Sequence, residues 1–443
     1  MERTPETQPV AANSDQRPLK VVLLCHSDKL GGASVVTRRL MQALRLEVVD
    51  ARMVVFNKLS EDENVDVPAT RFRRGVAFMT ERERILLRNG FSRRNLFKVS
   101  IASDGLPLHR HPWVREADVI CLSWINQGLL SLKGIRRIAA LGKPIVWTMH
   151  DMWNLTGICH HALECRAWEG ECGFCPYLNA KSPTDLSHKV WLRKRKLYSD
   201  LPITFVAVSN WLADCCRRSS LMRDADIRVI PNAFPIDSFI TSAKFSLHRV
   251  SETAKIILMG AARLDDPIKG LPMAIDALNY IFDNYPEVAR DSVAVFFGSV
   301  RDLSIFDKLR FPHQLLGNIQ DGNILRQLYA RSSVVISSSL YETLPGTLIE
   351  GQAAGCLPVT FGRGGQSDIV DHKVNGYIAR YQDVEDFAEG ILWALRNPAD
   401  RDRLHDEVRR RFSARSVARS YLALFRSLLN SEAGKDGNRD KTV

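Results

Sequence analysis

Residues 337–365 are SSSLYETLPGTLIEGQAAGCLPVTFGRGG, and this stretch indicates the class of fold. It follows the apolar, β-branched run 334–336, which is typical of a buried strand in a parallel sheet. The pattern then predicts a helix over 347–354, a short strand over 357–361 and a glycine turn over 362–365. Elements in this order predict a doubly wound α/β sheet, whose ligands lie beyond the carboxyl ends of the strands.

Two glutamates in this stretch are candidates for binding a ligand. Glu342 and Glu350 lie eight residues apart, and the second is part of the predicted helix. A carboxylate beyond a strand end can accept hydrogen bonds from ribose or sugar hydroxyls, and the glycines let backbone N–H groups approach phosphate. The alternative is a capped surface helix with incidental acids. The preceding strand and the following glycines favour the ligand site.

The whole pattern resembles the donor site of retaining glycosyltransferases of the GT-B fold, the large group called family 4. The resemblance implies two Rossmann-like, doubly wound domains facing a cleft, with a UDP- or GDP-sugar as donor and no catalytic metal. It implies that Glu350 binds the ribose. It also implies donor contacts from Glu342, Leu344, Gly364 and Gly365. Thr343 stands where many members have glycine, so the resemblance leaves the identity of the sugar open.

Composition limits the class of protein further. The 443 residues are enough for two domains, and no run approaches the ~18 apolar residues that span a bilayer. Residues 1–19 are polar, lack the apolar core of a signal peptide, and are expected to form a disordered tail. Nine cysteines without such a signal predict a reducing, cytoplasmic location. The net charge of +11 indicates an anionic partner: nucleotide phosphate, membrane lipid or nucleic acid.

Two features of the first half of the chain point to the same cleft. A strand is expected over 20–25, and Gly31 and Gly32 separate it from a helix over 35–44. A glycine pair before a helix binds anions well, although it can also be a simple turn. The resemblance implies that this loop faces the donor diphosphate and the acceptor. A later strand runs into His150, which resembles the family's active-site histidine that contacts the donor sugar.

Residues 71–98 combine positive charge with apolar side chains. They hold nine Arg or Lys and two Glu, with Phe, Leu, Ile, Met and Val between them. Such a segment is typical of a helix that binds an anionic membrane surface. The alternative is a core-packed helix with a solvated basic face, and the basic cluster 188–196 has the same two explanations. We expect peripheral association with the inner face of the plasma membrane.

Four cysteines fall within an insert over 156–178. Their spacing is C-x5-C-x6-C-x2-C, formed by Cys159, Cys165, Cys172 and Cys175. The C-x2-C pair followed by proline fits half of a structural zinc site, with the other cysteines or His161 as further ligands. Reactive or disulfide-bonded cysteines and ordinary buried thiols are the alternatives. A similar insert occurs in the family 4 enzymes that we associate with exopolysaccharide and colanic-acid-like polymers.

The second half of the chain begins near 229–235, which resembles the family's Pro-Asn-Gly linker with Ala233 in place of glycine. A strand over 255–260 is followed by Arg263 and Lys269, which match the family's diphosphate-binding pair. Cations are needed there because negative charge develops on the leaving nucleotide. The predicted domains are 20–228 and 229–415. One helix is expected over 399–429, of which the part over 416–430 crosses back onto the first domain, and a disordered tail is expected over 431–443.

These observations predict a retaining, hexosyl-type glycosyltransferase. The expected acceptor is a lipid-linked oligosaccharide in exopolysaccharide or lipopolysaccharide synthesis. The predicted catalytic residues are His150, Arg263, Lys269 and Glu342. One alternative is a non-catalytic nucleotide-sugar-binding subunit. A basic, zinc-containing nucleic-acid binder is the other, and the donor signature argues against it.

Overall fold

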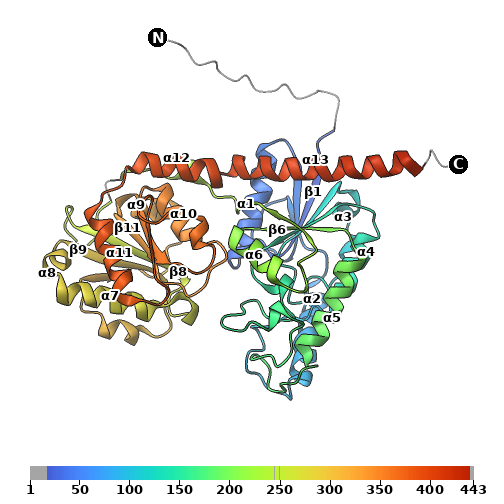
Figure 1. Ribbon diagram of the computed structural model, residues 1–443. Helices are drawn as coiled ribbons and strands as arrows, with labels where there is room; N and C mark the ends of the chain where they lie inside the picture. Colours follow the sequence, from blue (N-terminus) through green and yellow to red (C-terminus); the bar gives the residue numbers. More distant parts are fainter. Residues whose placement is uncertain (1–16, 244, 249, 440–443) are drawn as a thin grey trace, which may run out of the picture.

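The computed structural model describes residues 17–243, 245–248 and 250–439, so most of the predicted tail over 1–19 lies outside the described residues. The chain forms two domains that lie side by side, each built on a central sheet with helices on its faces (Figure 1). A long C-terminal helix runs across the first domain. No helix in the described ranges is long and apolar enough to cross a membrane.

The first domain contains a seven-stranded parallel sheet in the order β3-β2-β1-β4-β5-β6-β7. Its strands are β1 (Lys20–Ser27), β2 (Asp50–Asn57), β3 (Val65–Asp66), β4 (Val119–Leu122), β5 (Ile145–Met149), β6 (Ile203–Ala207) and β7 (Asp226–Val229). The strand expected over 20–25 is confirmed as β1, and the strand expected before His150 is confirmed as β5. The two edge strands were not predicted, because β3 has only two residues and β7 is largely exposed.

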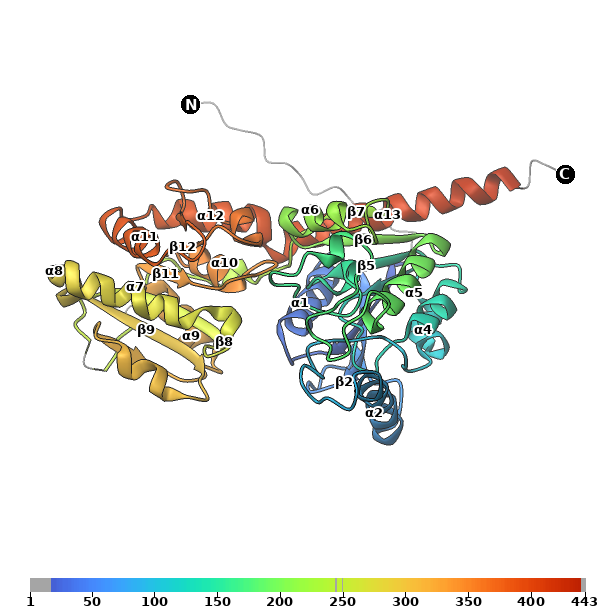
Figure 2. The ribbon, with the colours of Figure 1, turned by 60° about the horizontal axis from the view of Figure 1, so that its bottom comes forward.

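Six helices surround this sheet. They are α1 (Gly32–Leu46), α2 (Arg71–Arg88), α3 (Pro112–Glu116), α4 (Leu132–Ala139), α5 (Leu186–Asp200) and α6 (Asn210–Arg218). Side-chain oxygens of Thr70, Ser131, Asp185 and Ser209 cap four of them by accepting from backbone N–H groups of the first turn. Helix α2 lies at the end of the first domain opposite the C-terminal helix (Figure 2).

The second domain contains a six-stranded parallel sheet in the order β10-β9-β8-β11-β12-β13. Its strands are β8 (Lys255–Arg263), β9 (Ser292–Ser299), β10 (His313–Leu315), β11 (Val334–Ser337), β12 (Leu357–Phe361) and β13 (Tyr377–Ala379). Its helices are α7 (Leu271–Asn284), α8 (Pro286–Arg290), α9 (Gly322–Arg331), α10 (Gly346–Ala353) and α11 (Val384–Arg396). The strand–helix–strand unit predicted from residues 337–365 is therefore confirmed as β11, α10 and β12.

Both sheets reverse their strand order at one point. The reversal lies between β1 and β4 in the first domain and between β8 and β11 in the second. Loops at the carboxyl ends of strands flanking such a point diverge and leave a crevice for a ligand. The loops after β1, β4, β8 and β11 are therefore the positions where a ligand site is expected.

The end of the chain differs from the prediction of one helix over 399–429. It forms α12 (Arg401–Phe412) and α13 (Ala414–Arg439), separated at Ser413, whose backbone is extended. Ser413 pairs with Phe234 of the interdomain linker, and the N–H of Phe234 donates to the carbonyl of Phe412 at 2.9 Å. This pairing requires an extended residue between the two helices, so the helix cannot continue.

Helix α13 crosses back onto the first domain, as predicted for the GT-B fold. Arg415 and Arg419 contact Glu47 at the end of α1, and the hydroxyls of Tyr421 and Thr148 are 2.9 Å apart. The helix continues to Arg439, so the disordered tail predicted from Ser431 is wrong for most of its length. A helix that is already formed extends with one hydrogen bond per residue, which favours its continuation into a polar segment. Residues 440–443 lie outside the described residues.

Candidate active site

The turn after β8 packs directly on the turn after β11. The N–H of Leu340 donates to the carbonyl of Ile268 at 2.8 Å, and the hydroxyl of Ser338 donates to the carbonyl of Lys269 at 3.0 Å. Gly270 has a φ of +63°, and a Cβ at this position would lie 2.1 Å from the carbonyl oxygen of Ser338. Only glycine fits this contact. This contact fixes Lys269 beside the turn after β11, which carries Glu342 and is called the acidic turn below.

The glycine turn after β12 packs on the same acidic turn from the other side. The N–H of Gly365 donates to the carbonyl of Glu342 at 2.8 Å. A Cβ on Gly365 would lie 1.9 Å from the carbonyl oxygen of Thr343, and one on Gly364, whose φ is +106°, 2.4 Å from that of Glu342. Three loops, from β8, β11 and β12, therefore form one continuous surface at the carboxyl end of the second sheet.

Lys269 and Glu342 form an ion pair in this surface. The Lys269 ammonium donates to the Glu342 carboxylate, and the Ser339 hydroxyl donates to the same carboxylate oxygen at 3.1 Å. Burial alone would lower the pKa of Lys269, but the negative charge of Glu342 outweighs it and raises that pKa above its ordinary value. Lys269 therefore carries a positive charge at physiological pH.

Arg263 is the last residue of β8 and lies next to this pair. Its guanidinium contacts Asp266 at 2.8 Å and Asp265 at 3.5 Å. The Asp266 carboxylate also lies near the Lys269 ammonium. The structure therefore brings together Lys269 and Glu342 directly, and Arg263 with Lys269 through Asp266. Arg263 is about one-third exposed, which leaves it accessible to an anion.

Glu350 lies on α10 at the interface between the domains. Its carboxylate accepts a hydrogen bond at 3.1 Å from Arg39, which comes from α1 of the first domain. Burial raises the pKa of Glu350 above its ordinary value, and Arg39 counteracts that shift. No sequence pattern pointed to Arg39, because a contact between residues 311 positions apart depends on how the two domains meet.

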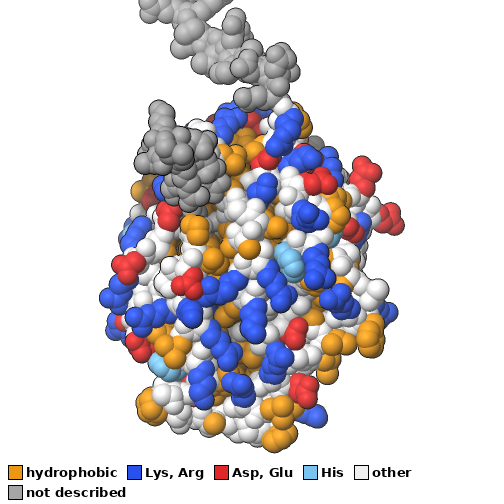
Figure 3. Space-filling model, turned by 90° about the vertical axis from the view of Figure 1, so that its right-hand side faces the viewer, with side chains coloured by type: hydrophobic (Ala, Val, Ile, Leu, Met, Phe, Trp, Pro, Cys, Tyr) orange, Lys and Arg blue, Asp and Glu red, His pale blue; other side chains and the backbone are white. Residues whose placement is uncertain are grey.

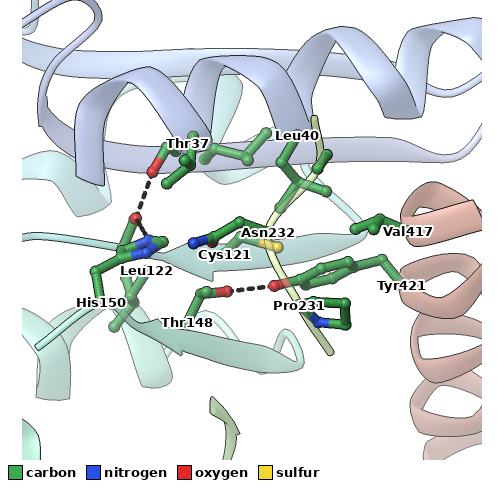
Figure 4. A pocket seen from close by; sticks show the side chains of 14 residues that line it. Thr37, Leu40, Cys121, Leu122, Thr148, His150, Pro231, Asn232, Val417 and Tyr421 are labelled. Atoms are coloured by element: carbon green, nitrogen blue, oxygen red, sulfur yellow. Dashed lines mark hydrogen bonds between the residues drawn. The ribbon is translucent and has the colours of Figure 1, made fainter. Parts of the chain in front are cut away.

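His150 follows β5 in the first domain, as predicted. Its Nε2 lies 2.7 Å from the hydroxyl of Ser123 after β4, and Ser123 lies 2.5 Å from the hydroxyl of Thr37 in α1 (Figure 4). Burial lowers the pKa of His150 to about 4, so its imidazole is neutral at physiological pH. Its Nδ1 is buried and has no hydrogen-bond partner among the described residues. The ring therefore keeps one unused hydrogen-bonding position.

Thr343 connects the two halves of the site. Its hydroxyl donates to the backbone carbonyl of His150 at 2.9 Å. The residue at which the sequence departs from the family pattern thus makes a contact between the domains. A glycine there would have no side chain to make it.

Asp151, the neighbour of His150, makes its hydrogen bonds within the first domain. Its carboxylate accepts from the indole of Trp124 at 2.9 Å and from the backbone N–H of Trp153 at 2.8 Å, and it contacts His160 at 2.7 Å. Burial opposes ionisation, but His160 and the N–H of Trp153 lower the pKa of Asp151 to about 2. This buried carboxylate fixes the loop after β5 that carries His150. Sequence reasoning did not give it this role.

The remaining predicted donor residues lie at the edges of the site. Gly31 and Gly32 are exposed at the N-terminus of α1, with nothing within 4 Å of a Cβ built on either. Leu344 is buried below the acidic turn. The open backbone at Gly31 and Gly32 leaves room for an anion at the start of the helix.

The four cysteines of the insert gather around one small cavity. Cys159, Cys165, Cys172 and Cys175 all line it, and the N–H of Gly157 points at the Cys172 sulfur at 3.2 Å. All nine cysteines are free thiols, so the disulfide alternative is not seen. Within the described ranges, no three His, Cys, Asp or Glu side chains are arranged to hold a metal ion. The structure thus contains no formed zinc site, and zinc binding stays a prediction.

Two family models match the chain, one in each domain. Residues 30–238 match Glycosyltransferase Family 4, and residues 247–411 match Glycosyl transferases group 1. The two matches follow one another and together include most of both domains.

Individual relatives match shorter stretches. The chain is 33% identical over 153 residues to the colanic acid biosynthesis glycosyl transferase WcaC of Escherichia coli (strain K12), a match of 32% of this chain and 36% of that protein. It is 27% identical over 188 residues to spore coat protein SA of Bacillus subtilis (strain 168), covering 39% of this chain and 48% of that protein. The chain thus matches between about a third and a half of the length of these curated relatives.

Solved structures match over both domains. Anabaena Alr3699/HepE in complex with UDP and glucose is 16% identical, with a TM-score of 0.58 over 92% of this chain and all of that one. Sucrose-phosphate synthase from Thermosynechococcus elongatus is 14% identical, with a TM-score of 0.62 over 94% of this chain and all of that one. At these identities the likeness shows the fold alone. Together with the two family matches, it shows that the chain belongs to glycosyltransferase family 4 and has the GT-B fold.

Proposed function

We propose that this protein transfers a sugar from a nucleotide-diphosphate sugar to a glycan acceptor, with retention of the anomeric configuration. The observation that carries the proposal is a direct contact between the site residues of the two domains. Thr343, next to Glu342 in the second domain, bonds to the backbone of His150 in the first. The loop that carries His150 therefore touches the turn that carries Glu342, and a donor sugar bound beside this contact would lie between its nucleotide and the acceptor.

Each side chain has a role in this proposal. Lys269 and Arg263 stabilise the charge that develops on the leaving diphosphate. Glu350 accepts hydrogen bonds from the ribose, and Glu342 from hydroxyls of the sugar. The imidazole of His150 is neutral, so it bonds to the sugar without acting as an acid. The glycine turn offers backbone N–H groups to the donor.

We propose retention because the sequence resembles family 4, and the state of the carboxylates bears only on the route of the transfer. Glu342 is paired with Lys269, and Glu350 with Arg39, so neither is the free nucleophile that a retaining glycosidase uses. We therefore propose attack on the same face from which the nucleotide leaves, with a donor phosphate oxygen accepting the proton of the acceptor hydroxyl. Analysis of the anomeric configuration of the product by NMR tests this directly, and inversion would contradict it.

A screen of sugar nucleotides tests the proposed function itself. UDP-sugars come first, because the Anabaena structure contains UDP, and GDP-sugars follow. A ligand at 100 times its Kd adds about 2.7 kcal/mol to the free energy of unfolding, which raises the melting temperature by several degrees. Stabilisation without turnover on any acceptor would favour the non-catalytic subunit. Absence of binding by any sugar nucleotide would contradict both functions.

We further propose that the acceptor is a lipid-linked oligosaccharide at an anionic membrane surface. The similarity to WcaC, a colanic acid biosynthesis enzyme by name, supports the acceptor. Helix α2 and the loop after it support the surface, because they expose apolar and basic side chains together. The exposed apolar residues are Phe72, Val76, Met79, Leu87, Phe91 and Phe97. The exposed basic residues are Arg71, Arg73, Arg84, Arg88, Arg93, Arg94 and Lys98.

This exposure argues against a core-packed helix with only a solvated basic face. Phe72 is 83% exposed and Phe91 71%, so large apolar side chains face solvent beside the cations. Arg82, in contrast, is buried against Glu81 at 3.3 Å, and Arg74 bonds to the carbonyl of Phe56. These two arginines stabilise the fold and are unavailable to lipid.

A second basic region lies on a neighbouring face. Figure 3 shows Lys and Arg side chains gathered over the side of the first domain that carries α4 and α5. Exposed members include Lys133 and Arg137 of α4, and Arg193, Arg195 and Lys196 of α5. This surface extends the positive potential from α2 and would strengthen attraction to an anionic leaflet.

Binding to anionic vesicles is expected to be salt-sensitive and to weaken by about 100-fold when Arg73, Arg93 and Arg94 are replaced by Gln. Each cation near an anionic leaflet contributes about 1 kcal/mol, and ~3 kcal/mol corresponds to about this factor. Co-sedimentation with anionic and neutral liposomes at low and high salt measures it. The matched control replaces the exposed Arg290, Arg301 and Arg403 of the second domain and its C-terminal helices by Gln. Equal pelleting with both lipids, or with neither, would reject the membrane surface.

Zinc binding by Cys159, Cys165, Cys172 and Cys175 is proposed as a structural feature of the insert. Elemental analysis of freshly purified, reduced protein is expected to give close to one zinc per chain. Chelation is expected to lower the melting temperature of wild type and to leave a Cys172→Ser, Cys175→Ser variant unchanged, because that variant lacks the C-x2-C pair. Protein without metal would reject the proposal and leave four ordinary thiols.

A further inference from the structure

We propose that Arg39 is a positioning residue that binds the Glu350 carboxylate across the cleft and orients it for the ribose of the donor. The inference rests on the proposed function, which places the ribose at Glu350. Nη2 of Arg39 lies 3.1 Å from Oε1 of Glu350, and the two side chains are 27% and 15% exposed. The pair is enclosed enough to be shielded from salt, yet open enough to be reached by a ligand.

The linker between the domains holds Arg39 in place. Its guanidinium lies over the ring of Phe234, 5.1 Å from the centroid, which is a cation–π contact. Phe234 is buried, and a Cβ on Gly346, the first residue of α10, would lie 3.0 Å from its ring. The ring thus fills the space between α1 and the helix that carries Glu350. Arg39 is stacked on one side and hydrogen-bonded on the other.

Arg39 favours the ionised form of Glu350. Burial raises its pKa, and the groups that act against this are Arg39 from α1 and the hydroxyl of Tyr329 from α9. Arg39 is the charged member of this set and has the larger effect. An ionised carboxylate only accepts hydrogen bonds and has about four acceptor sites, so the bond to Arg39 leaves capacity for two ribose hydroxyls.

The pair connects the arrangement of the domains with donor binding. Arg39 belongs to the first domain and Glu350 to the second, so their contact depends on how the two domains meet. The arrangement seen here therefore favours the form of Glu350 that binds ribose. By linkage, a donor that binds this form favours the same arrangement to the same extent.

Replacing Arg39 by Gln tests the role through the pH dependence of donor affinity. An arginine beside a carboxyl group lowers the pKa by about one unit or more, so in the variant Glu350 takes up its proton at a pH higher by that amount. The probes are UDP-glucose and GDP-mannose, whose diphosphate esters do not titrate between pH 5 and 8. The midpoint of the fall in affinity with falling pH is expected to lie about one pH unit higher in Arg39→Gln than in wild type.

Three further variants separate this role from others. Arg39→Lys keeps the charge and is expected to restore most of the wild-type pH profile. Arg38→Gln removes the neighbouring arginine, which pairs with Asp62 at 3.6 Å inside the first domain, and is expected to leave the profile unchanged. In a Glu350→Gln background, Arg39→Gln is expected to have no further pH effect, because no carboxyl remains to titrate.

Two results would overturn the inference while the proposed function stands. One is that wild type binds the probe and Arg39→Gln binds it with the same affinity and the same pH dependence. The other is an equal loss at every pH, which would mean that Arg39 contacts the donor or supports the fold without acting through Glu350. Failure of wild type to bind any sugar nucleotide of the screen, these two probes included, would instead contradict the proposed function, and the role of Arg39 would fall with it.

Discussion

Replacing Lys269 by Ala is expected to lower turnover by about 100-fold or more, the scale seen when one preorganised donor is removed from a site of developing charge. The Lys269 ammonium is held beside the Glu342 carboxylate by a turn that only glycine permits. Its loss removes a cation from the leaving diphosphate and leaves Glu342 enclosed without its partner. Both effects act on the transition state, so kcat falls with kcat/KM.

Arg263→Ala is expected to act in the same direction, because Arg263 lies on the other side of Asp266 from Lys269. Lys308→Ala is the matched control, since this lysine is exposed in the same domain. Product formation from the sugar nucleotide found in the screen measures the effect, and thermal melting shows whether each variant is folded. Near-wild-type transfer by both Lys269→Ala and Arg263→Ala would remove the diphosphate assignment.

The fold could be predicted from sequence wherever strands are buried on both faces. The runs that became β1, β5, β11 and β12 are largely apolar, because helices cover both sides of a parallel sheet. The edges could not be predicted in this way. β7 is mostly exposed, so its residues carry no apolar run that would distinguish it from a loop.

Helix periodicity was a poor guide to where helices end. Good helix formers occupy both sides of Ser413, so the pattern continues through the break between α12 and α13. The one local signal is Ser413 itself, whose hydroxyl accepts from the N–H of Ser416 at 3.3 Å, as an N-cap does. The force that breaks the helix is tertiary: the pairing with Phe234 in the linker.

The second-domain half of the site was accessible from sequence, and the contacts across the cleft were not. Glu342 and Lys269 lie in loops that follow strands flanking the reversal of the sheet, so topology brings them together. Arg39 and Thr343 act through the meeting of two domains, which no spacing within one strand–helix unit encodes. The count of basic residues over 71–98 similarly included Arg82 as a surface cation, although the structure buries it against Glu81.

Replacing Gly365 by Ala is expected to lower turnover by about 100-fold while the chain remains folded. The added Cβ would lie 1.9 Å from the carbonyl oxygen of Thr343, and backbone cannot move aside as a flexible side chain would. The glycine turn must therefore separate from the acidic turn, which breaks the 2.8 Å bond from the Gly365 N–H to Glu342. Displacement of a site by about 1 Å can cost this factor in rate.

Two glycine controls distinguish this displacement from backbone strain. Gly364 combines a φ of +106° with a contact of 2.4 Å to the Glu342 carbonyl, so Gly364→Ala is expected to lose both stability and turnover. Gly317 has a φ of +64° but nothing within 4 Å of a Cβ, so Gly317→Ala carries the strain alone. It is expected to lose about 1 kcal/mol of stability and to keep its turnover.

Turnover in Gly365→Ala equal to that of Gly317→Ala would mean that the glycine turn lies outside the donor site. A selective loss in Gly364→Ala and Gly365→Ala would place the reaction where the turns after β11 and β12 meet.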